Sequence, residues 1–279
     1  MSLPPLLDTL PLLAALLAAG AVAGLSAGLF GVGGGFVVVP ALLLAFGALL
    51  DGGDSDLYVA VGTSLATIIV TSIRSVQAHN QRGSVDFDIL KTWAPWIVLG
   101  VAGGVVVAAL VETRTLLLTF AVGVLIYAVY FLRPRFVVAR ERYYALPTGA
   151  GRAALASGLS AFSALLGIGG GTPFVVTMVV CGRPVHQAVG TAAGIGFLIA
   201  VPGTLGFALM GLGQPALPPG SIGYVNLPAF AAIALVSVFT APLGARLAHS
   251  LSEIHLRKAF GVYLLLVSAM MFAKYNTLS

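Results

Sequence analysis

The sequence predicts an all-α polytopic membrane protein built from two inverted repeats, each a re-entrant helical hairpin followed by three transmembrane helices. Of its 279 residues, 59% are hydrophobic and 8% are charged, and the mean hydropathy is +1.04. An ordinary soluble domain is about 45–50% apolar and ~25% charged. Two further observations indicate the repeats. Apolar segments recur along the chain, and glycine runs interrupt them at residues 31–35 and 167–171.

The first hairpin is predicted from the glycine run at 31–35, which separates the apolar segments 11–30 and 35–50. Glycine is a poor helix former, and in lipid its exposed backbone groups must be satisfied by protein or by a water-lined cavity. We therefore expect the chain to enter the membrane, turn at the glycines and leave on the same side. Residues 1–11 carry no Lys or Arg, so we expect no cleaved signal there.

The remaining apolar segments predict the other helices. They cover residues 57–78, 92–111, 115–133, 152–168, 172–182, 185–210, 224–246 and 257–275. A helix needs about 20 residues to cross a ~30 Å hydrocarbon core, and the segment 172–182 is too short. We join it to 152–168 as a second hairpin that turns at the second glycine run. The other segments give three crossings in each half.

The charges orient these elements. The segment between the halves is basic, with Arg133, Arg135, Arg140, Arg142 and Arg152 against one acid, Glu141. By the positive-inside rule it should face the cytoplasm. The chain then divides into a first repeat at 1–135, a cytoplasmic linker at 136–151 and a second, inverted repeat at 152–279. Counting crossings from the linker places the acidic loop 51–56 outside, the basic cluster near 246–258 inside, and both termini outside.

Internal similarity supports two copies. Three motifs recur in the same order: Gly-Leu-Ser-Ala at 24–27 and 158–161, Ala-Val-Gly-Thr at 60–63 and 188–191, and Gly-Ser followed by a β-branched residue at 83–85 and 220–222. Because each half has an odd number of crossings, the copies should have opposite orientations. Such inverted repeats, related by a pseudo-two-fold axis in the membrane plane, are typical of transporters.

These motifs resemble a known family. The glycine runs after Gly-Leu-Ser-Ala, the Val-Gly-Thr helix starts, and His79 followed by Gly83-Ser84-Val85-Asp86 are similar to the sulfite exporter TauE/SafE family, also called the toluene sulfonate uptake permease family. The resemblance covers nearly the whole chain. It implies a plasma-membrane carrier for sulfite, for sulfonates such as sulfoacetate, or for related small sulfur-containing anions.

The glycine runs are the first candidate site. A helix that begins at a glycine turn presents unpaired backbone N–H groups and the positive end of its dipole to an anion. We expect the second arm of the first hairpin to start at Phe36, and Thr172 to cap the second arm of the other hairpin, with Pro173 at its first helical position. The two tips should meet near the membrane midplane. The expected donors are Gly33, Gly34, Gly35 and Phe36 on one tip, and Gly169, Gly170, Gly171 and Thr172 on the other.

An alternative is that glycines serve only close helix packing, which we expect of Gly20, Gly24 and Gly28.

Hydroxyl side chains on the crossing helices are a second group of candidate site residues. The substrate-facing candidates on the crossing helices are Thr63, Ser64, Thr67 and, in the second copy, Thr191. Such hydroxyls can line a polar cavity, or they can bond back to a carbonyl of their own helix.

Arg74 lies near the predicted cytoplasmic end of the first crossing helix. It is expected either to attract anions to an inner vestibule or to extend its side chain to the membrane interface. Gln77, His79 and Asn80 could continue the same polar path, and His79 could alternatively carry a coupling proton.

Other chemistries find little support. The sequence contains no His-Glu-x-x-His pattern, no clustered carboxylates and no Walker A lysine motif, and one cysteine allows neither an internal disulfide nor a cysteine metal cluster. The 14 Lys and Arg residues gather at segment ends, so the net charge of +5 indicates topology and not nucleic-acid binding. We expect no cofactor, no metal and no enzymatic activity.

The predicted function is a secondary transporter of the cell membrane that exports sulfite or small organosulfonate anions by alternating access. Three alternatives stay open: an anion channel, a carrier for another small carboxylate or sulfur compound, and a membrane enzyme or assembly subunit. Small-residue faces exposed to lipid would allow a homodimer.

Overall fold

The computed structural model describes residues 6–49, 55–133, 144–215, 217–248 and 253–277. Parts of three predicted features lie outside these residues: the segment 1–11, the acidic loop 51–56 and the arginine-rich linker 136–151.

The described residues form ten helices and one short two-stranded sheet. The helices are α1 (Leu6–Phe30), α2 (Gly35–Leu49), α3 (Asp56–Asn80), α4 (Phe87–Leu110), α5 (Thr113–Leu132), α6 (Gly149–Leu165), α7 (Gly171–Val180), α8 (Val185–Met210), α9 (Leu227–Leu247) and α10 (Glu253–Thr277). The strands β1 (Ser221–Ile222) and β2 (Val225–Asn226) pair antiparallel, with Ser221 opposite Asn226. Each predicted apolar segment corresponds to one of these helices.

Several helix starts differ from the predicted bounds by a few residues, and two of them, those of α4 and α9, are set by side-chain caps. α4 begins before residue 92, because the Asp86 carboxylate accepts hydrogen bonds from the N–H groups of Asp88 and Ile89, both at 3.1 Å. α9 begins after residue 224, because β2 precedes it and Asn226 Oδ1 accepts from the N–H of Ala229 at 3.0 Å. A side-chain acceptor at the N-cap satisfies amide groups that have no partner within the helix.

Seven of the described helices are long and apolar enough to cross a membrane, namely α1, α3, α4, α5, α8, α9 and α10. α2 and α7 are shorter apolar helices. This arrangement confirms the predicted all-α polytopic membrane protein.

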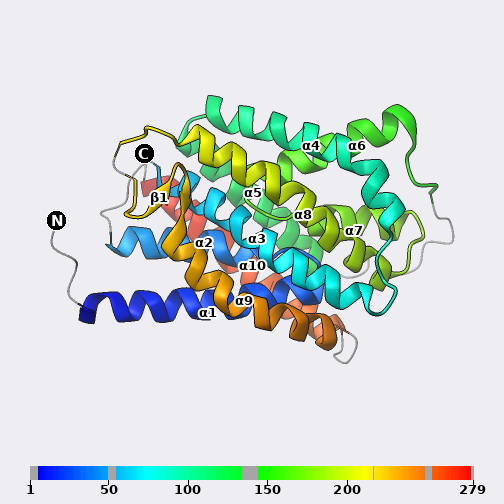
Figure 1. Cartoon of the computed structure of the whole chain (residues 1–279), viewed down its shortest axis with the longest axis horizontal. Helices are drawn as coiled ribbons and strands as arrows, with labels where there is room; N and C mark the ends of the chain where they lie inside the picture. The colour runs from blue at the N-terminus through cyan, green and yellow to red at the C-terminus, as the bar shows by residue number, and fades with distance from the viewer. Residues whose placement is uncertain (1–5, 50–54, 134–143, 216, 249–252, 278–279) are drawn as a thin grey trace.

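The two predicted hairpins are present and open toward opposite ends of the bundle (Figure 1). The apolar part of α1 is long enough to span a membrane by itself. The chain nevertheless turns back after Phe30, and α2 packs against α1. α6 and α7 form the second hairpin, whose arms begin and end at the end of the bundle opposite to the start of α1 (Figure 1).

The helices pack in a regular set of pairs. α1 packs on α9, α4 on α6, α5 on α10, and α3 on both α8 and α9. In Figure 1 the turn between α4 and α5, the start of α9 and the end of α10 lie at one end of the bundle, and the turns from α3 to α4 and from α7 to α8 lie at the other. This alternation agrees with the crossing order counted from the sequence.

Glycines make the seam between α1 and α9. A Cβ placed on Gly20 would lie 2.5 Å from the carbonyl oxygen of Ile233, and a Cβ on Gly24 would lie 2.9 Å from the Cα of Ser237. A Cβ on Gly28 would overlap the carbonyl oxygen of Ala241. The expectation that these glycines serve close helix packing is therefore confirmed.

Candidate functional site

The first hairpin turns through three glycines in a left-handed backbone conformation. Gly31, Gly33 and Gly34 have φ angles of 65°, 73° and 81°. A residue with a Cβ adopts this region only at a steric cost, so glycine is required where the chain reverses. α2 then starts at Gly35, one residue before the predicted start at Phe36.

The second hairpin turns in the same way, with φ angles of 62° at Gly167 and 66° at Gly170. The prediction that Thr172 caps α7 is wrong. Gly170 is the N-cap, α7 starts at Gly171, and Pro173 lies within the first turn. That position tolerates proline, because amide groups of a first turn have no carbonyl partner within the helix.

The two tips touch each other, backbone to backbone. A Cβ on Gly171 would overlap the carbonyl oxygen of Gly31, and a Cβ on Gly35 would overlap that of Gly167. Gly33 and Gly169 face each other, because a Cβ on Gly33 would lie 3.3 Å from the Cα of Gly169. The structure thus brings together the two glycine runs that lie far apart in the sequence.

The first amide groups of both short helices are available for a ligand. In the described part of the chain, the N–H groups of the predicted donor residues make no backbone hydrogen bond; these residues are Gly33, Gly34, Gly35, Phe36, Gly169, Gly170, Gly171 and Thr172. Such groups, at the positive end of a helix dipole, are suited to binding an anion. Because the tips are in contact, an anion would reach the inner groups only after the tips move apart.

α3 holds both tips through side-chain hydroxyls. Ser64 Oγ donates to the carbonyl oxygen of Gly167 at 2.8 Å, and Thr71 Oγ1 donates to that of Gly33 at 3.1 Å. Ser75 Oγ lies 3.4 Å from the carbonyl oxygen of Ala27, at the end of the first arm. Sequence reasoning singled out Ser64 but missed Thr71 and Ser75. Ser64, Thr67, Thr71 and Ser75 follow one another in steps of three, four and four residues along one helix face, and this spacing is the signal that could have found them.

Polar and apolar groups of α3 meet at the junction of the tips. Ile68 is fully buried there, and its Cγ2 lies 3.0 Å from the Cβ positions of both Gly33 and Gly169. A Cβ on Gly196 of α8 would lie 2.8 Å from Ser72 Oγ and 3.0 Å from the carbonyl oxygen of Gly169. Ser72 therefore lies beside the second tip.

Two hydroxyls in this region are buried without a hydrogen bond. The side chains of Ser72 and Thr172 are 1% and 3% exposed, and neither oxygen has a partner among the described residues. A buried hydroxyl that lacks a partner is unfavourable and therefore uncommon in folded proteins. A ligand with hydrogen-bond acceptors would satisfy both groups.

Thr63 and Thr191 have matching partners in opposite halves of the chain. Thr63 Oγ1 accepts a hydrogen bond from the N–H of Asn226 at 2.8 Å, and Thr191 Oγ1 accepts from the N–H of Asp86 at 2.9 Å. Asn226 and Asp86 are the N-caps of α9 and α4. Each threonine thus holds the start of a helix from the other half, a structural use that the sequence did not indicate.

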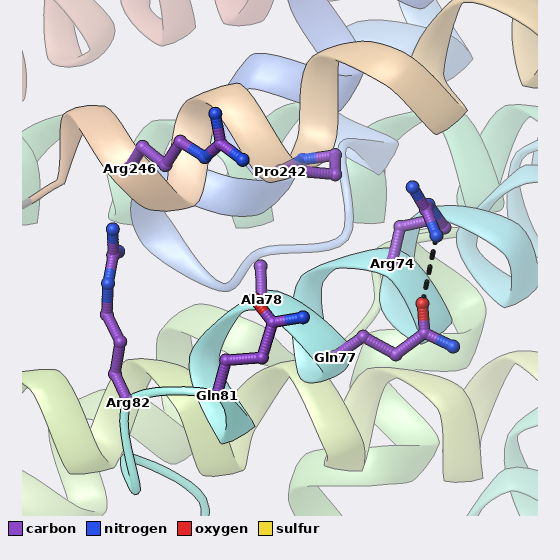
Figure 2. Close-up of a pocket in the computed structure, with 7 residues that line it drawn as sticks. All are labelled: Arg74, Gln77, Ala78, Gln81, Arg82, Pro242 and Arg246. Carbon is purple, nitrogen blue, oxygen red and sulfur yellow. Dashed lines mark hydrogen bonds between the residues drawn. The ribbon is translucent and has the colours of Figure 1, made fainter.

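The other predicted residues of α3 lie apart from the tips or bond locally. Thr67 Oγ1 donates to the carbonyl oxygen of Ser64 in its own helix at 2.7 Å. His79 is buried, with its Nε2 3.1 Å from the carbonyl oxygen of Gly28. Asn80 is exposed at the end of α3. Arg74 and Gln77 line a separate cavity between α3 and α9 (Figure 2).

No group of three or more His, Cys, Asp or Glu side chains that could hold a metal ion occurs among the described residues. Arg183 and Asp86 form an ion pair, with 3.5 Å between Nη2 and Oδ2. It links the turn after α7 to the N-cap of α4, so it belongs to the bundle end and not to the tips.

Comparisons with known proteins agree with this architecture. The family model described as Sulfite exporter TauE/SafE matches residues 16–271. The chain is 34% identical to a "Probable membrane transporter protein" of Haemophilus influenzae, over 91% of this chain and 96% of the relative. It is 26% identical to a protein of Methanocaldococcus jannaschii with the same description, over 90% of this chain and 91% of the relative. No solved structure gives a significant match.

Proposed function

The chain belongs to the sulfite exporter TauE/SafE family, and from this premise we propose that it is a secondary transporter that exports sulfite or a small organosulfonate anion. Family membership and the multi-pass helical fold make the protein a membrane transporter and not an enzyme. The substrate, the direction of transport and the mechanism are our proposal.

The observation that carries the proposal is the pair of glycine tips. They present two sets of amide groups without backbone acceptors, together with the buried hydroxyls of Ser72 and Thr172. Sulfite and sulfonates carry negative charge on several oxygens, each of which can accept hydrogen bonds from such donors. Neutral donors also allow release, since no buried cation has to be separated from the anion.

The packing pairs support two inverted repeats, at 1–135 and 152–279. An axis that exchanges the halves would exchange α1 with α6 and α9 with α4, and the observed pairs α1–α9 and α6–α4 follow this rule. The hydrogen bonds of Thr63 and Thr191 follow it as well. We propose that the repeats rock against each other, which would part the tips toward each side of the membrane in turn.

The proposed direction of transport, out of the cell, follows from the membrane potential. With a cell interior that is negative, an exported anion moves down the electrical gradient, which is worth ~2.3 kcal/mol per charge per 100 mV. Export then needs neither ATP nor a coupling ion. We also propose that the arginine-rich linker 136–151 is cytoplasmic and both termini are outside, although the potential drives the anion outward in either orientation.

The test is a flux panel with purified protein in liposomes, using sulfite, sulfate, sulfoacetate and taurine. A carrier would show saturable flux and counterflow, whereas a channel would show continuous single-channel currents. If none of these compounds moves, the proposed substrate class is wrong.

A pair of variants on α7 tests the site. Thr172→Val removes a buried hydroxyl that makes no hydrogen bond with the described residues, so it should leave folding stability unchanged or raise it. If the hydroxyl binds the anion, affinity should fall about tenfold or more, because hydrogen bonds to charged groups contribute ~1.5–3 kcal/mol. Thr177→Val is the control, since Thr177 Oγ1 bonds within its own helix to the carbonyl oxygen of Pro173. Equal affinity in wild type and Thr172→Val would remove Thr172 from the site.

A further inference from the structure

A basic cavity of about 150 Å³ lies between α3 and α9, and no residue of the two glycine runs lines it. Its lining includes three arginines, Arg74 and Arg82 from the end of α3 and the turn after it, and Arg246 from α9. Figure 2 shows Arg74 and Arg82 at opposite sides of the view, with their side chains directed toward α9, and Arg246 on α9 above Arg82. Arginines from α9 and from the end of α3 and the turn after it thus line this cavity, which we call the arginine slot.

The positive charge of this slot is not balanced by acidic side chains. None of its lining residues is an Asp or Glu, and the described part of the chain contains no ion pair to any of the three arginines. Arg74 Nε donates to the carbonyl oxygen of Val238 at 3.4 Å, and Arg82 Nη1 donates to that of Ala245 at 3.0 Å. Arg74 also donates to Gln77 Oε1 at 3.1 Å. A guanidinium has five N–H donors, so most of the donors in the slot remain for a ligand.

An apolar groove of about 410 Å³ lies on the other side of the same stretch of α3. Its wall is formed mainly by Ile73, Val76, Phe87, Leu90, Phe197 and Leu198, with Lys91 as the one charged lining residue. Gln77 lines both the groove and the basic slot. The arginine slot and the apolar groove therefore share one lining residue, Gln77.

We propose that this combined surface binds an anionic phospholipid, with the headgroup phosphate in the arginine slot and an acyl chain in the groove. The arginines lie near the ends of membrane-spanning helices, where headgroups lie and where long basic side chains place their charges. A phosphate matches the guanidinium groups, since arginine forms strong paired hydrogen bonds with phosphate oxygens. A soluble anion would use the slot alone and would give the adjoining groove no role.

The experiment measures lipid binding to the purified full-length protein by native mass spectrometry. Phosphatidylglycerol and phosphatidylcholine with the same acyl chains are titrated separately, and the proposal predicts preferential binding of phosphatidylglycerol. The double variant Arg82→Gln/Arg246→Gln should weaken that binding roughly tenfold or more. The control, Arg114→Gln/Lys274→Gln, removes the same charge at the opposite end of the bundle and should bind as the wild type does (Figure 1).

The groove is tested by Ala94→Phe, which fills it with a larger side chain. This variant should also weaken phosphatidylglycerol binding while leaving the arginines unchanged. Glycerol 1-phosphate, which has the phosphate without acyl chains, should compete poorly. If the double variant does not fold, the single variants Arg82→Gln and Arg246→Gln carry the same expectation with a smaller loss.

Three results would overturn the proposal: equal binding of the two lipids, no effect of the arginine variants, or no effect of Ala94→Phe. Competition by glycerol 1-phosphate as strong as that of the whole lipid would make the slot a site for soluble anions, which also contradicts it. Lipid binding is measured without any transport, so its outcome is independent of the flux panel.

Discussion

Ser64 donates its hydroxyl proton to the carbonyl oxygen of Gly167 across 2.8 Å, although the two residues are 103 positions apart in the chain. A crossing helix of the first half thereby holds the hairpin tip of the second half. Thr71 on the same helix holds the tip of its own half through Gly33. α3 is therefore the element on which the two tips are positioned relative to each other.

Ser64→Ala should destabilise the protein by about 1–3 kcal/mol, because the buried carbonyl of Gly167 loses its donor. The measurement is the free energy of unfolding in detergent by denaturant titration. Thr67→Val is the matched control, since Thr67 bonds only to the carbonyl of Ser64 within α3 and its loss should cost less. Equal losses of unfolding free energy in the two variants would show that the hydrogen bond from Ser64 to the second tip contributes no more to stability than the local bond of Thr67 does.

The helices and both hairpin turns could be predicted from the sequence, because hydropathy, helix length and glycine conformation are local properties. The two glycine runs were predicted to meet, and they do. The side-chain partners around them were not predictable in this way. Sequence shows that Thr63 and Thr191 are hydroxyls at matching positions, but the groups they bond lie 163 and 105 residues away.

The start of α7 shows a second limit. A threonine followed by proline is a common start for a helix, and it suggested a cap at Thr172. The left-handed conformation of Gly170 instead lets the helix begin earlier, which places the Thr172 hydroxyl inside the protein without a partner among the described residues. The sequence thus held two signals for the start of α7, the Thr-Pro pair and Gly170. The backbone freedom of Gly170 determines where the turn ends.

Thr63→Val and Thr191→Val should each cost about 1–3 kcal/mol of unfolding free energy, because each removes the acceptor of a helix-capping residue's amide. Serine keeps the hydroxyl, so Thr63→Ser and Thr191→Ser should recover most of the loss. The two pairs share no partner, so the double valine variant should show the sum of the single losses. Thermal unfolding of all five variants checks this. If the serine variants do not recover the stability lost in the valine variants, the hydroxyl groups of the two threonines do not account for the loss.

Gly171→Ala tests the contact between the tips. Its Cβ would overlap the carbonyl oxygen of Gly31, so the tips should be forced apart at a cost of about 1–3 kcal/mol. Gly158→Ala in α6 is the control, because a Cβ there meets nothing within 4 Å. That change should stabilise the helix by ~0.5–1 kcal/mol. Unfolding titrations of the two variants should move in opposite directions, and a stable Gly171→Ala protein would show that the tips do not need to touch.

Cys181, the one cysteine of the chain, can report which side of the membrane the turn after α7 faces. The crossing count predicts the cytoplasm, so an impermeant maleimide should label Cys181 in inside-out vesicles and not in intact cells. Burial raises the pKa of the Cys181 thiol above its ordinary value. The thiolate is the reactive form, so labelling at pH 7 should be slower than for a free thiol and should keep rising as the pH passes the ordinary cysteine pKa.

Gln214→Cys in a Cys181→Ser background gives the opposite control, because Gln214 is exposed in the connection between α8 and α9, at the other end of the bundle. It should react in intact cells. Labelling of Cys181 from outside, with Gln214→Cys protected, would reverse the predicted orientation. The membrane potential would still favour export, because the electrical gradient for an anion does not depend on how the protein is oriented in the membrane.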